Sequence, residues 1–508
     1  QDIEMVVFKS NLSGMNSTKW DASATRDESI MAWYTTNSSG AHTVYIGSND
    51  EIFANQDSSY LFANIGSSTK CKSTTAIKDI EVLNTKNVTN MFHMFENCGA
   101  NAMISLNLGS AFDTSNVTNM VGMFYKCGYT AMTTIDLGSN FDTTKVTDMN
   151  WMFGYCGYTA LTSLDLKSKF DTSKVTNMNS MFRDCGNQSM TTLNLENNFN
   201  TSSVTDMGAM FGATGMTKMT TLDLKDKFDT SNVVTMHWMF SDCGRYSMTT
   251  LNLGFKFNTS KVLNMVGMFN RTGQYKLKSL NLGKLFYTTN VTDMSIMFSN
   301  TGSSEMTSLD LGPAFTKIPG GTIQNSAYPE ENIDTTHLAY TRMFENTGKS
   351  GAVIYAPESI YSARQAFKLG KTSTTAISYT QGTINVKYKP EWKKVSSTIN
   401  TTNNTISVTI RGNVNTTNYT STVTSNLKPE NIKIVIDGVE TTEITKSVTT
   451  GTVTSTYVDY IITLSNFEKA RKNGKDFKEW SGNIALRIDG RGESSSTYSK
   501  NVLVDQYG

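Results

Sequence analysis

Residues Met103 to Ala131, MISLNLGSAFDTSNVTNMVGMFYKCGYTA, form a unit that recurs along the chain with almost constant spacing. Valines mark the period, each 29 residues from the next: Val88, Val117, Val146, Val175, Val204, Val233, Val262 and Val291. A fixed period of about 20 to 50 residues is typical of proteins that stack one supersecondary unit on the next. The sequence therefore predicts a solenoid.

Within one repeat, the pattern predicts a short strand followed by a short helix. Leu106 and Leu108 flank Asn107, so the leucines fall on one side of a strand and the amide on the other. Four apolar residues then follow at i, i+3, i+4 and i+7, the spacing of one helix face: Met120, Met123, Phe124 and Cys127. We expect an α/β solenoid, similar to a leucine-rich repeat, with a parallel sheet.

Stacking gives these units a core that none could form alone. A 29-residue unit is shorter than the ~40 residues that a lone domain usually needs. Placing like residues on like residues in successive repeats buries them as columns. The chain contains 27 methionines, whose unbranched thioethers fill irregular gaps in a narrow core. We interpret the Met columns as core, and we expect neither a metal nor a cofactor.

The repeat strings resemble a known family. FDTSNVTNMVGMFYKCG (112–128), FDTTKVTDMNWMFGYCG (141–157) and FDTSKVTNMNSMFRDCG (170–186) are similar to the BspA-type leucine-rich-repeat surface proteins of bacteria. The resemblance spans roughly Ser59 to Ala366. It implies a secreted or surface-attached protein that adheres to components of host or neighbouring cells.

Composition narrows the partner class. The chain has 508 residues, with 45 Lys plus Arg against 44 Asp plus Glu. This balance argues against nucleic acid or an anionic membrane as the partner. No apolar run reaches the ~18 residues of a membrane span. Since the chain begins at Gln1, we expect a piece of a longer secreted protein located at the cell surface.

The cysteines predict buried thiols. Five of the six share one repeat column, which Thr fills in the other repeats: Cys98, Cys127, Cys156, Cys185 and Cys243. Neighbouring strands lie about 4.8 Å apart, within the Cα range of a disulfide. Stacked side chains run parallel, however, and Thr replaces Cys freely. We therefore favour a ladder of small buried residues over disulfides.

The order of patterns along the chain predicts three parts. Residues 1–60 contain short β-prone runs and are expected to form an N-terminal β cap. Residues 61–375 are expected to form the solenoid, with an irregular C-terminal cap from about 313, where the six prolines begin. From about 382 to 508, apolar and polar residues alternate over six or seven short stretches. This pattern predicts an all-β sandwich that resembles bacterial immunoglobulin-like stalk modules.

The sequence offers little sign of catalysis. The four histidines share no helix face at ligand spacing, and no HExxH, GxSxG or P-loop motif occurs. A Cys71–His93 nucleophile pair lacks a residue that would orient the base. On the polar sheet face, Asp136 and Asp165 are adjacent, so calcium bridging and ice ordering are alternatives to a solvated surface. We expect no enzyme, and we interpret this face as solvated.

The candidate recognition residues are Trp151 and Trp238, with His93 and His237. On a helix of about 100° per residue, Trp151 falls nearly opposite the core methionines. Exposed tryptophans are frequent in binding hot spots. The alternative is that loop residues fold over the indoles and make a second small core. The sequence thus predicts partner binding or a subunit contact at these four residues.

Two functions remain open at this stage. The first is a non-enzymatic extracellular surface protein whose solenoid binds a protein or glycan and whose immunoglobulin-like domain is a stalk. The second is a structural subunit that binds copies of itself in a fibre, sheath or surface layer. Fold alone does not choose between them. Exposed, complementary ends would favour the subunit.

Overall fold

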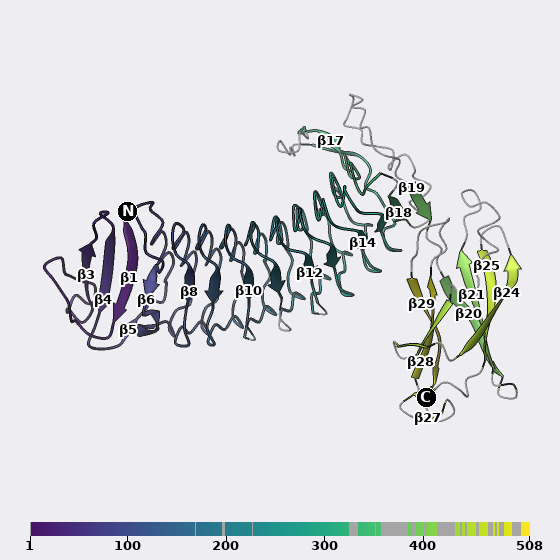
Figure 1. The fold of residues 1–508 in the computed structure, drawn as a ribbon, viewed down its shortest axis with the longest axis horizontal. Coiled ribbons are helices and arrows are strands. Elements are labelled where there is room, and N and C mark those ends of the chain that lie inside the picture. The colour runs from purple at the N-terminus through teal and green to yellow at the C-terminus, as the bar shows by residue number, and fades with distance from the viewer. Residues whose placement is uncertain are drawn as a thin grey trace. The chain divides into compact units, whose positions relative to one another are not determined.

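The computed structural model divides the chain into two units, residues 1–387 and residues 388–508 (Figure 1). It describes residues 2–167, 169–195, 199–225, 227–324, 334–350 and 352–356, together with strands and short turns between residues 385 and 507. Residues 357–384 include the predicted end of the solenoid at 375 and the predicted domain start at 382. Both boundaries therefore lie outside the described residues.

The first unit begins with a five-stranded sheet in the order β2-β3-β4-β1-β6. Its strands are β1 (Ile3–Lys9), β2 (Trp20–Asp21), β3 (Met31–Thr36), β4 (His42–Gly47) and β6 (Ile77–Lys78). β1 runs parallel to both β4 and β6. Val6 and Phe8 on β1 are buried in the same hydrophobic core as the first repeats. The sheet therefore shields the end of the stacked core.

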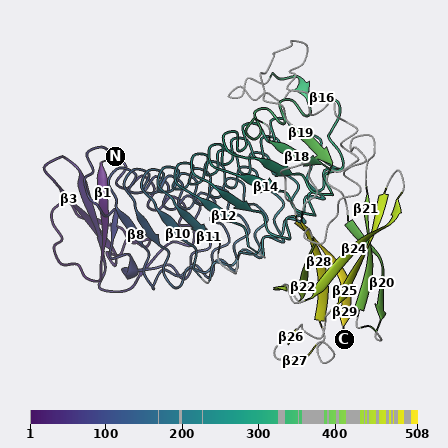
Figure 2. The same cartoon turned by 45° about the vertical axis from the view of Figure 1, so that its right-hand side comes forward.

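A short connection follows this sheet. β5 (Ile52–Phe53) pairs in parallel with β7 (Leu83–Asn84), and the 3-10 turn η1 (Ile80–Val82) lies just before β7. From there each repeat adds one coil to the stack, as Figures 1 and 2 show.

Each coil contributes a three-residue strand whose central apolar residue is buried. The strands are β8 (Ser105–Asn107), β9 (Thr134–Asp136), β10 (Ser163–Asp165), β11 (Thr192–Asn194), β12 (Thr221–Asp223), β13 (Thr250–Asn252), β14 (Ser279–Asn281) and β15 (Ser308–Asp310). Neighbouring strands pair in parallel as β8 with β9, β10 with β11, β12 with β13 and β14 with β15. The offset is one repeat, so that Leu106 lies opposite Ile135. The predicted parallel strand stack with polar residues facing outward is confirmed.

The insertion after β15 does not end the stack. β18 (Val353–Ala356) pairs in parallel with β15, with Leu309 opposite Ile354. Between these two strands, β16 (Thr322–Ile323) pairs antiparallel with β17 (His337–Leu338). The insertion thus adds a small antiparallel pair, and the chain then returns to the repeat register.

The predicted helices are wrong. No α-helix occurs among the described residues, and the second half of each repeat is a run of tight turns. The Met94 N–H donates to the Met91 carbonyl at 3.2 Å, whereas the Met91 and His93 N–H groups donate to Asn119 and Val121 of the next repeat. An α-helix would bond every N–H to the residue four earlier in the same segment. Here alternate N–H groups bond to the neighbouring coil instead. In the described part of the repeats, the regular elements are therefore β-strands.

These turns have the apolar spacing that suggested a helix. Each contains two residues four apart in the left-handed region, such as His93 at φ 51° and Asn97 at φ 55°. Bends at these positions bring the four residues at i, i+3, i+4 and i+7 to the interior, where each is fully buried: Met91, Met94, Phe95 and Cys98. Phe95 stacks on Phe124 of the next coil with ring centroids 5.3 Å apart. A 3.6-residue pattern and this turn pattern are therefore indistinguishable by periodicity.

A column of buried threonines also stabilises the core, and the sequence pattern did not predict it. The Thr114 hydroxyl donates to the Asp142 carbonyl, and Thr143 donates to Asp171, each at 2.7 Å. The same column is buried throughout: Thr85, Thr114, Thr143, Thr172, Thr201, Thr230, Thr259 and Thr288. A buried hydroxyl without a partner is costly, so these bonds let the polar column lie inside the solenoid.

The six cysteines are buried free thiols, as predicted. A hydrogen bond with Cys98 and burial together raise the pKa of the Cys127 thiol well above its usual range. Where Thr replaces Cys, its hydroxyl takes a backbone partner, as Thr214 does with the Phe182 carbonyl at 2.7 Å. The column therefore holds small side chains that are either sulfhydryls or satisfied hydroxyls.

The second unit, in its described part, consists of antiparallel strands. One sheet has the order β20-β21-β25-β24, and another has the order β23-β22-β28-β29. The first comprises β20 (Trp392–Asn400), β21 (Thr405–Asn413), β24 (Thr445–Val453) and β25 (Tyr457–Ser465). The second comprises β22 (Ile432–Ile436), β23 (Val439–Thr441), β28 (Gly482–Asp489) and β29 (Ser499–Tyr507). Outside these sheets lies the hairpin β26 (Arg471–Lys472) with β27 (Lys475–Asp476). The strand β19 (Asn385–Tyr388) instead follows β18 in the sheet order β14-β15-β18-β19, and all but its last residue belong to the first unit.

Alternation along β21 explains its sheet. Ile406, Val408 and Ile410 are buried, and Arg411 pairs with Asp459 of β25 through two hydrogen bonds of 2.7 and 2.8 Å. The predicted β content is present, but the immunoglobulin-like assignment is not confirmed. In the described part of the chain, no helix is long and apolar enough to cross a membrane.

Candidate functional site

The stacked turns form one long side of the solenoid, here called the turn face (residues 91–98, 120–127, 149–156 and their equivalents). A column of left-handed residues runs along it, and these side chains remain at least partly exposed. The column reads Asn97, Lys126, Tyr155, Asp184, Ala213, Asp242, Arg271, Asn300 and Asn346. Because each position is a bend held by backbone bonds, its side chain can vary without disturbing the core. The side chains at these bends therefore differ from repeat to repeat above an unchanged core.

Aromatic side chains gather on the first part of the turn face. This aromatic cluster comprises Tyr60, Phe92, His93, Tyr125, Tyr129, Trp151, Tyr155 and Tyr158. Tyr60 stacks on His93 with ring centroids 5.4 Å apart, and His93 lies 6.0 Å from Tyr125. Tyr125 meets Trp151 edge-on at 5.5 Å, and Trp151 stacks on Tyr155 at 6.1 Å. Such contacts contribute about 0.5–1.5 kcal/mol each beyond burial, so the cluster is a rigid surface.

The cluster continues to a pair of stacked tyrosines. Tyr155 lies 6.1 Å from Tyr158, and Tyr158 stacks on Tyr129 at 4.8 Å with the rings only 3° from parallel. Tyr129 and Tyr158 are equivalent residues of neighbouring repeats, so the coil spacing itself sets their stacking distance. All of these rings are partly exposed or half-buried.

Two of the four predicted recognition residues belong to this cluster. His93 and Trp151 both contact Tyr125, which lies between them in the cluster. The His93 Nδ1 atom lies 2.9 Å from Glu96 Oε2, and its ring covers Gly122, where a Cβ would approach within 2.5 Å. Trp151 is half-buried, with the Arg183 guanidinium 5.5 Å from its ring.

The other two predicted residues, Trp238 and His237, lie further along the stack, with Trp238 three repeats beyond Trp151. Trp238 contacts the buried Val266 and Ile296. It also covers Gly267, where a Cβ would come within 2.4 Å of the ring. The structure therefore separates Trp238 from Trp151 in environment as well as in distance along the stack. The predicted helical position opposite the core does not exist, because both tryptophans occupy left-handed bends with φ near 57°.

His237 is held beside Trp238 in the same turn. Its Nδ1 atom lies 2.8 Å from the Thr235 hydroxyl, and its ring occupies the space above Gly208. Burial lowers the pKa of His237, and the nearby Asp206 carboxylate only partly opposes this effect. The residue is therefore a packed, neutral imidazole at neutral pH. Partner binding by these four residues stays a prediction.

Next to the aromatic cluster lies a groove of about 460 Å³, here called the tyrosine groove. It is lined by Ser67, Asn97, Ala100, Asn101, Tyr125, Lys126, Tyr129, Thr130 and Tyr155. The Lys126 ammonium lies 5.3 Å from the Tyr125 ring and 5.8 Å from the Tyr155 ring. Burial raises the pKa of both Tyr129 and Tyr155, so their hydroxyls stay protonated. The groove thus offers aromatic faces, neutral polar groups and one ammonium.

Backbone groups around the groove are already used between coils. The Asn97 N–H donates to the Tyr125 carbonyl at 2.7 Å, and the Lys126 N–H donates to Gly154 at 2.8 Å. The Thr130 N–H donates to the Ala100 carbonyl at 3.0 Å. A ligand in the groove would therefore be recognised largely by side chains.

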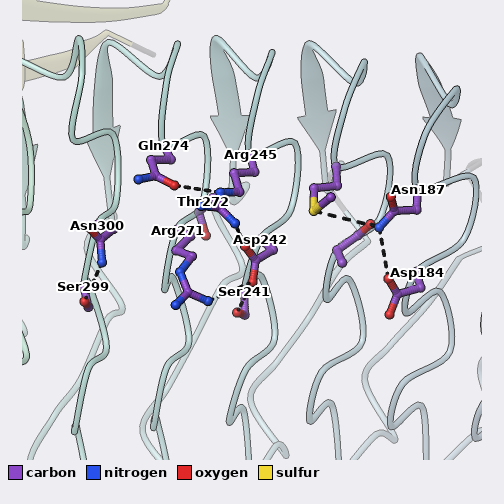
Figure 3. Close-up of polar contacts among 12 residues, drawn as sticks. Asp184, Asn187, Ser241, Asp242, Arg245, Arg271, Thr272, Gln274, Ser299 and Asn300 are labelled. Atoms are coloured by element: carbon purple, nitrogen blue, oxygen red, sulfur yellow. Dashed lines mark hydrogen bonds and ion pairs between the residues drawn. The ribbon is translucent and has the colours of Figure 1, made fainter. Parts of the chain in front are cut away.

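Further along the turn face, charged and amide groups replace the aromatic rings. Figure 3 shows Asp242 between Arg245 and Arg271, with nitrogen-to-oxygen distances of 3.2 and 3.7 Å. Arg245 also donates to the Gln274 side chain at 2.7 Å. Nearer the cluster, Asn187 donates to Asp184 at 3.0 Å, and burial raises the pKa of that carboxyl group. The contacts of Arg271 with Asp242 and of Arg245 with Gln274 join neighbouring repeats and so reinforce the stack.

On the polar face of the sheet, charged side chains likewise pair with one another. The Lys167 ammonium lies 3.0 Å from Asp165 and 3.6 Å from Asp136, the two carboxylates considered for calcium. A lysine between them supplies the positive charge that a calcium ion would otherwise bring. Among the described residues, no three His, Cys, Asp or Glu side chains are grouped to hold a metal.

The residues that matter most for the groove, Tyr125, Lys126 and Tyr129, are not among those predicted from the sequence. A signal did exist, because Tyr129 and Tyr158 are one repeat apart and Tyr125 precedes Tyr155 by 30 residues. Only the turn geometry shows that residues offset by 29 or 30 positions meet on one surface.

Comparison with known proteins agrees with the repeat pattern. Residues 64–189, 135–247 and 215–309 match a family described as Mycoplasma protein of unknown function, DUF285. Residues 64–309 therefore carry DUF285 repeats. The predicted resemblance is confirmed for this repeat array, but neither a leucine-rich repeat nor an immunoglobulin-like domain is. No curated protein and no solved structure matches the chain.

Proposed function

We propose that this chain is a non-enzymatic extracellular surface protein whose DUF285 repeats bind a partner on host or neighbouring cells. The observation that carries the proposal is the tyrosine groove beside the aromatic cluster on the turn face. Partly exposed tyrosine and tryptophan rings held at fixed spacing are typical of recognition surfaces, because they lose little conformational entropy on binding. The likeness of the repeats to BspA-type surface proteins supports the location.

The architecture suits a rigid display of this surface. Every turn is tied to the next by backbone hydrogen bonds, and a continuous core runs from Phe8 to Phe344. A ligand that contacts several repeats therefore meets a preorganised site, which reduces the entropic cost of binding. In this proposal the second unit is an immunoglobulin-like stalk; its antiparallel sheets are compatible with that role.

The alternative is a structural subunit of a fibre, sheath or surface layer. Head-to-tail stacking of solenoids needs an open coil at each end. The N-terminal sheet instead covers the first coils, since Val6 and Phe8 are buried in the repeat core. This arrangement supports partner binding over end-to-end polymerisation.

Cell binding by the purified full chain tests the proposal. Fluorescently labelled protein should bind cells, and the double variant Tyr125→Ala/Tyr129→Ala should lose most of that binding. Tyr246→Ala/Tyr275→Ala is the control, because it also removes two turn-face tyrosines, whose rings stack with centroids 5.2 Å apart and do not line the groove. Equal binding by both variants, or filaments of the purified chain in negative-stain micrographs, would refute the proposal.

A further inference from the structure

We infer that the tyrosine groove binds an acidic saccharide, with the sugar carboxylate at Lys126 and the sugar ring against Tyr129 and Tyr155. The inference rests on the proposed function and names the ligand class of the same surface. It follows from three features of the groove: its ring faces, its single charge and the backbone N–H groups that already bond between coils.

The ring faces suit a pyranose. Tyr129 and Tyr155 line the groove, and Tyr158 holds both rings through stacking contacts at 4.8 and 6.1 Å. A pyranose has a C–H face that packs on an aromatic ring and hydroxyls that need polar partners at the rim. Asn97 and Asn101 donate their side-chain N–H groups to Asn64 and Cys71 at 2.8 Å. These bonds fix the orientation of the two amide groups, whose oxygens can accept hydrogen bonds from sugar hydroxyls.

The single positive charge of the groove favours an acidic ligand. Lys126 is the only residue with a full charge among the nine that line the groove. Its ammonium is held over two rings, so part of its hydration is already replaced by aromatic faces. Neighbouring carboxylates already have partners other than Lys126: Glu96 pairs with His93 at 2.9 Å, and Asp184 accepts hydrogen bonds from Asn187 at 3.0 Å and from the Tyr155 hydroxyl. A ligand carboxylate would therefore gain a charge-assisted bond at Lys126.

The backbone disfavours a peptide. An extended peptide gains most of its affinity by adding main-chain hydrogen bonds to a free sheet edge. Around the groove, the N–H groups of Asn97, Lys126 and Thr130 already bond to the next or preceding coil. The lining also has Ala100 as its only aliphatic side chain, so it lacks an apolar anchor pocket. Hydroxyls, amides and rings remain, and these match a saccharide.

Two matched pairs of sugars test the inference by calorimetry with the full chain. Hyaluronan tetrasaccharide is compared with chitotetraose, which lacks the uronate, and 3′-sialyllactose is compared with lactose. We expect the acidic member of at least one pair to bind with roughly millimolar or better affinity and the neutral member to bind at least tenfold more weakly. The pair that responds distinguishes a uronate from a sialate. Added salt should weaken the acidic sugar's binding.

The Lys126→Gln variant locates the site. It should reduce binding of the acidic sugar about tenfold while leaving the melting temperature unchanged, because Lys126 is partly exposed and its backbone bonds remain. Lys276→Gln is the control, since Lys276 follows the second tyrosine stack and pairs with Glu305 at 2.8 Å. Unchanged affinity in Lys126→Gln, or equal losses in both variants, overturns the inference.

Two further outcomes also overturn it. One is equal binding of acidic and neutral sugars; the other is no heat with any of the four sugars. If cell binding is nevertheless lost in Tyr125→Ala/Tyr129→Ala, the proposed function stands with another ligand class. A third result would change the ligand class. If no sugar binds, but the groove binds acidic peptides and Lys126→Gln abolishes that binding, the ligand is a protein.

Discussion

Substituting Gly267 by Ala tests whether Trp238 is a packing residue. A Cβ at Gly267 would lie 2.4 Å from Trp238 Cε3 and 2.5 Å from Cζ3. The indole cannot move away freely, because it already packs on Val266 and Ile296. Overpacking of this kind costs about 1–3 kcal/mol. The left-handed backbone at φ 58° adds about 1–2 kcal/mol for any residue with a side chain.

The expected destabilisation is therefore about 2–5 kcal/mol, of which only the backbone part should survive when the indole is removed. Gly109→Ala is the control, since Gly109 has φ 69° and no atom within 4 Å of the added Cβ. It should cost only about 1–2 kcal/mol. In a Trp238→Ala background, Gly267→Ala should fall to the same value.

Hydrogen exchange by mass spectrometry measures these differences locally, which matters because long repeat arrays need not unfold in one step. The informative amides are Trp238, which donates to the Val266 carbonyl at 2.7 Å, and Gly267, which donates to Ser295 at 2.9 Å. If the Trp238 amide and the amide of residue 267 exchange at equal rates in Gly267→Ala and Gly109→Ala, the indole is not packed on Gly267. The same result would revive Trp238 as an exposed recognition residue.

Four other outcomes follow from the structure. Thiol titration of the denatured, unreduced chain should count all six cysteines, whereas the native chain should react slowly because every thiol is buried; two or fewer thiols would mean disulfides. Thr143→Val should cost about 1–3 kcal/mol by leaving the Asp171 carbonyl without its donor. Thr147→Val should be nearly neutral, because Val234 already occupies the equivalent exposed position; equal costs would contradict the stabilising role of the buried threonine column. Burial lowers the pKa of His237 in the folded state. The stability that the neutral imidazole contributes should therefore be complete above pH ~6.5, the pKa of an unperturbed histidine, and should be lost as the pH falls towards the lowered pKa. Urea unfolding of His237→Gln at several pH values should show no such loss at acidic pH. Chelation with EDTA should leave the melting temperature unchanged, and a fall of more than about 5 °C would indicate a structural metal.

The sequence by itself determined the repeat and the interior. The 29-residue step of the valines shows that like residues must stack, and the leucines of Ser105–Leu108 show which side of the strand is buried. These conclusions follow from periodicity alone, because hydrophobic residues that recur at equivalent positions can be buried together only by stacking. The exchange of Cys and Thr in one column likewise predicted free thiols correctly.

Tertiary structure decided how the second half of each repeat is built. The spacing of Met91, Met94, Phe95 and Cys98 fits both a helix and a run of turns with a left-handed residue every fourth position. A helix bonds within itself, whereas these turns donate alternate N–H groups to the next coil, as Met91 does to Asn119. The choice therefore depends on hydrogen-bond partners about 28 residues away, which local propensity does not contain.

The candidate site follows from the same choice. Helical geometry placed Trp151 and Trp238 alike, opposite the core, but the left-handed bends give them different surroundings. Trp238 faces a glycine and two aliphatic side chains, while Trp151 faces Tyr125 and Tyr155. The groove exists only because consecutive coils place residues 29 or 30 apart within ring-contact distance. The sequence thus determined the columns, and the bends of the backbone decided which side chains meet on the surface.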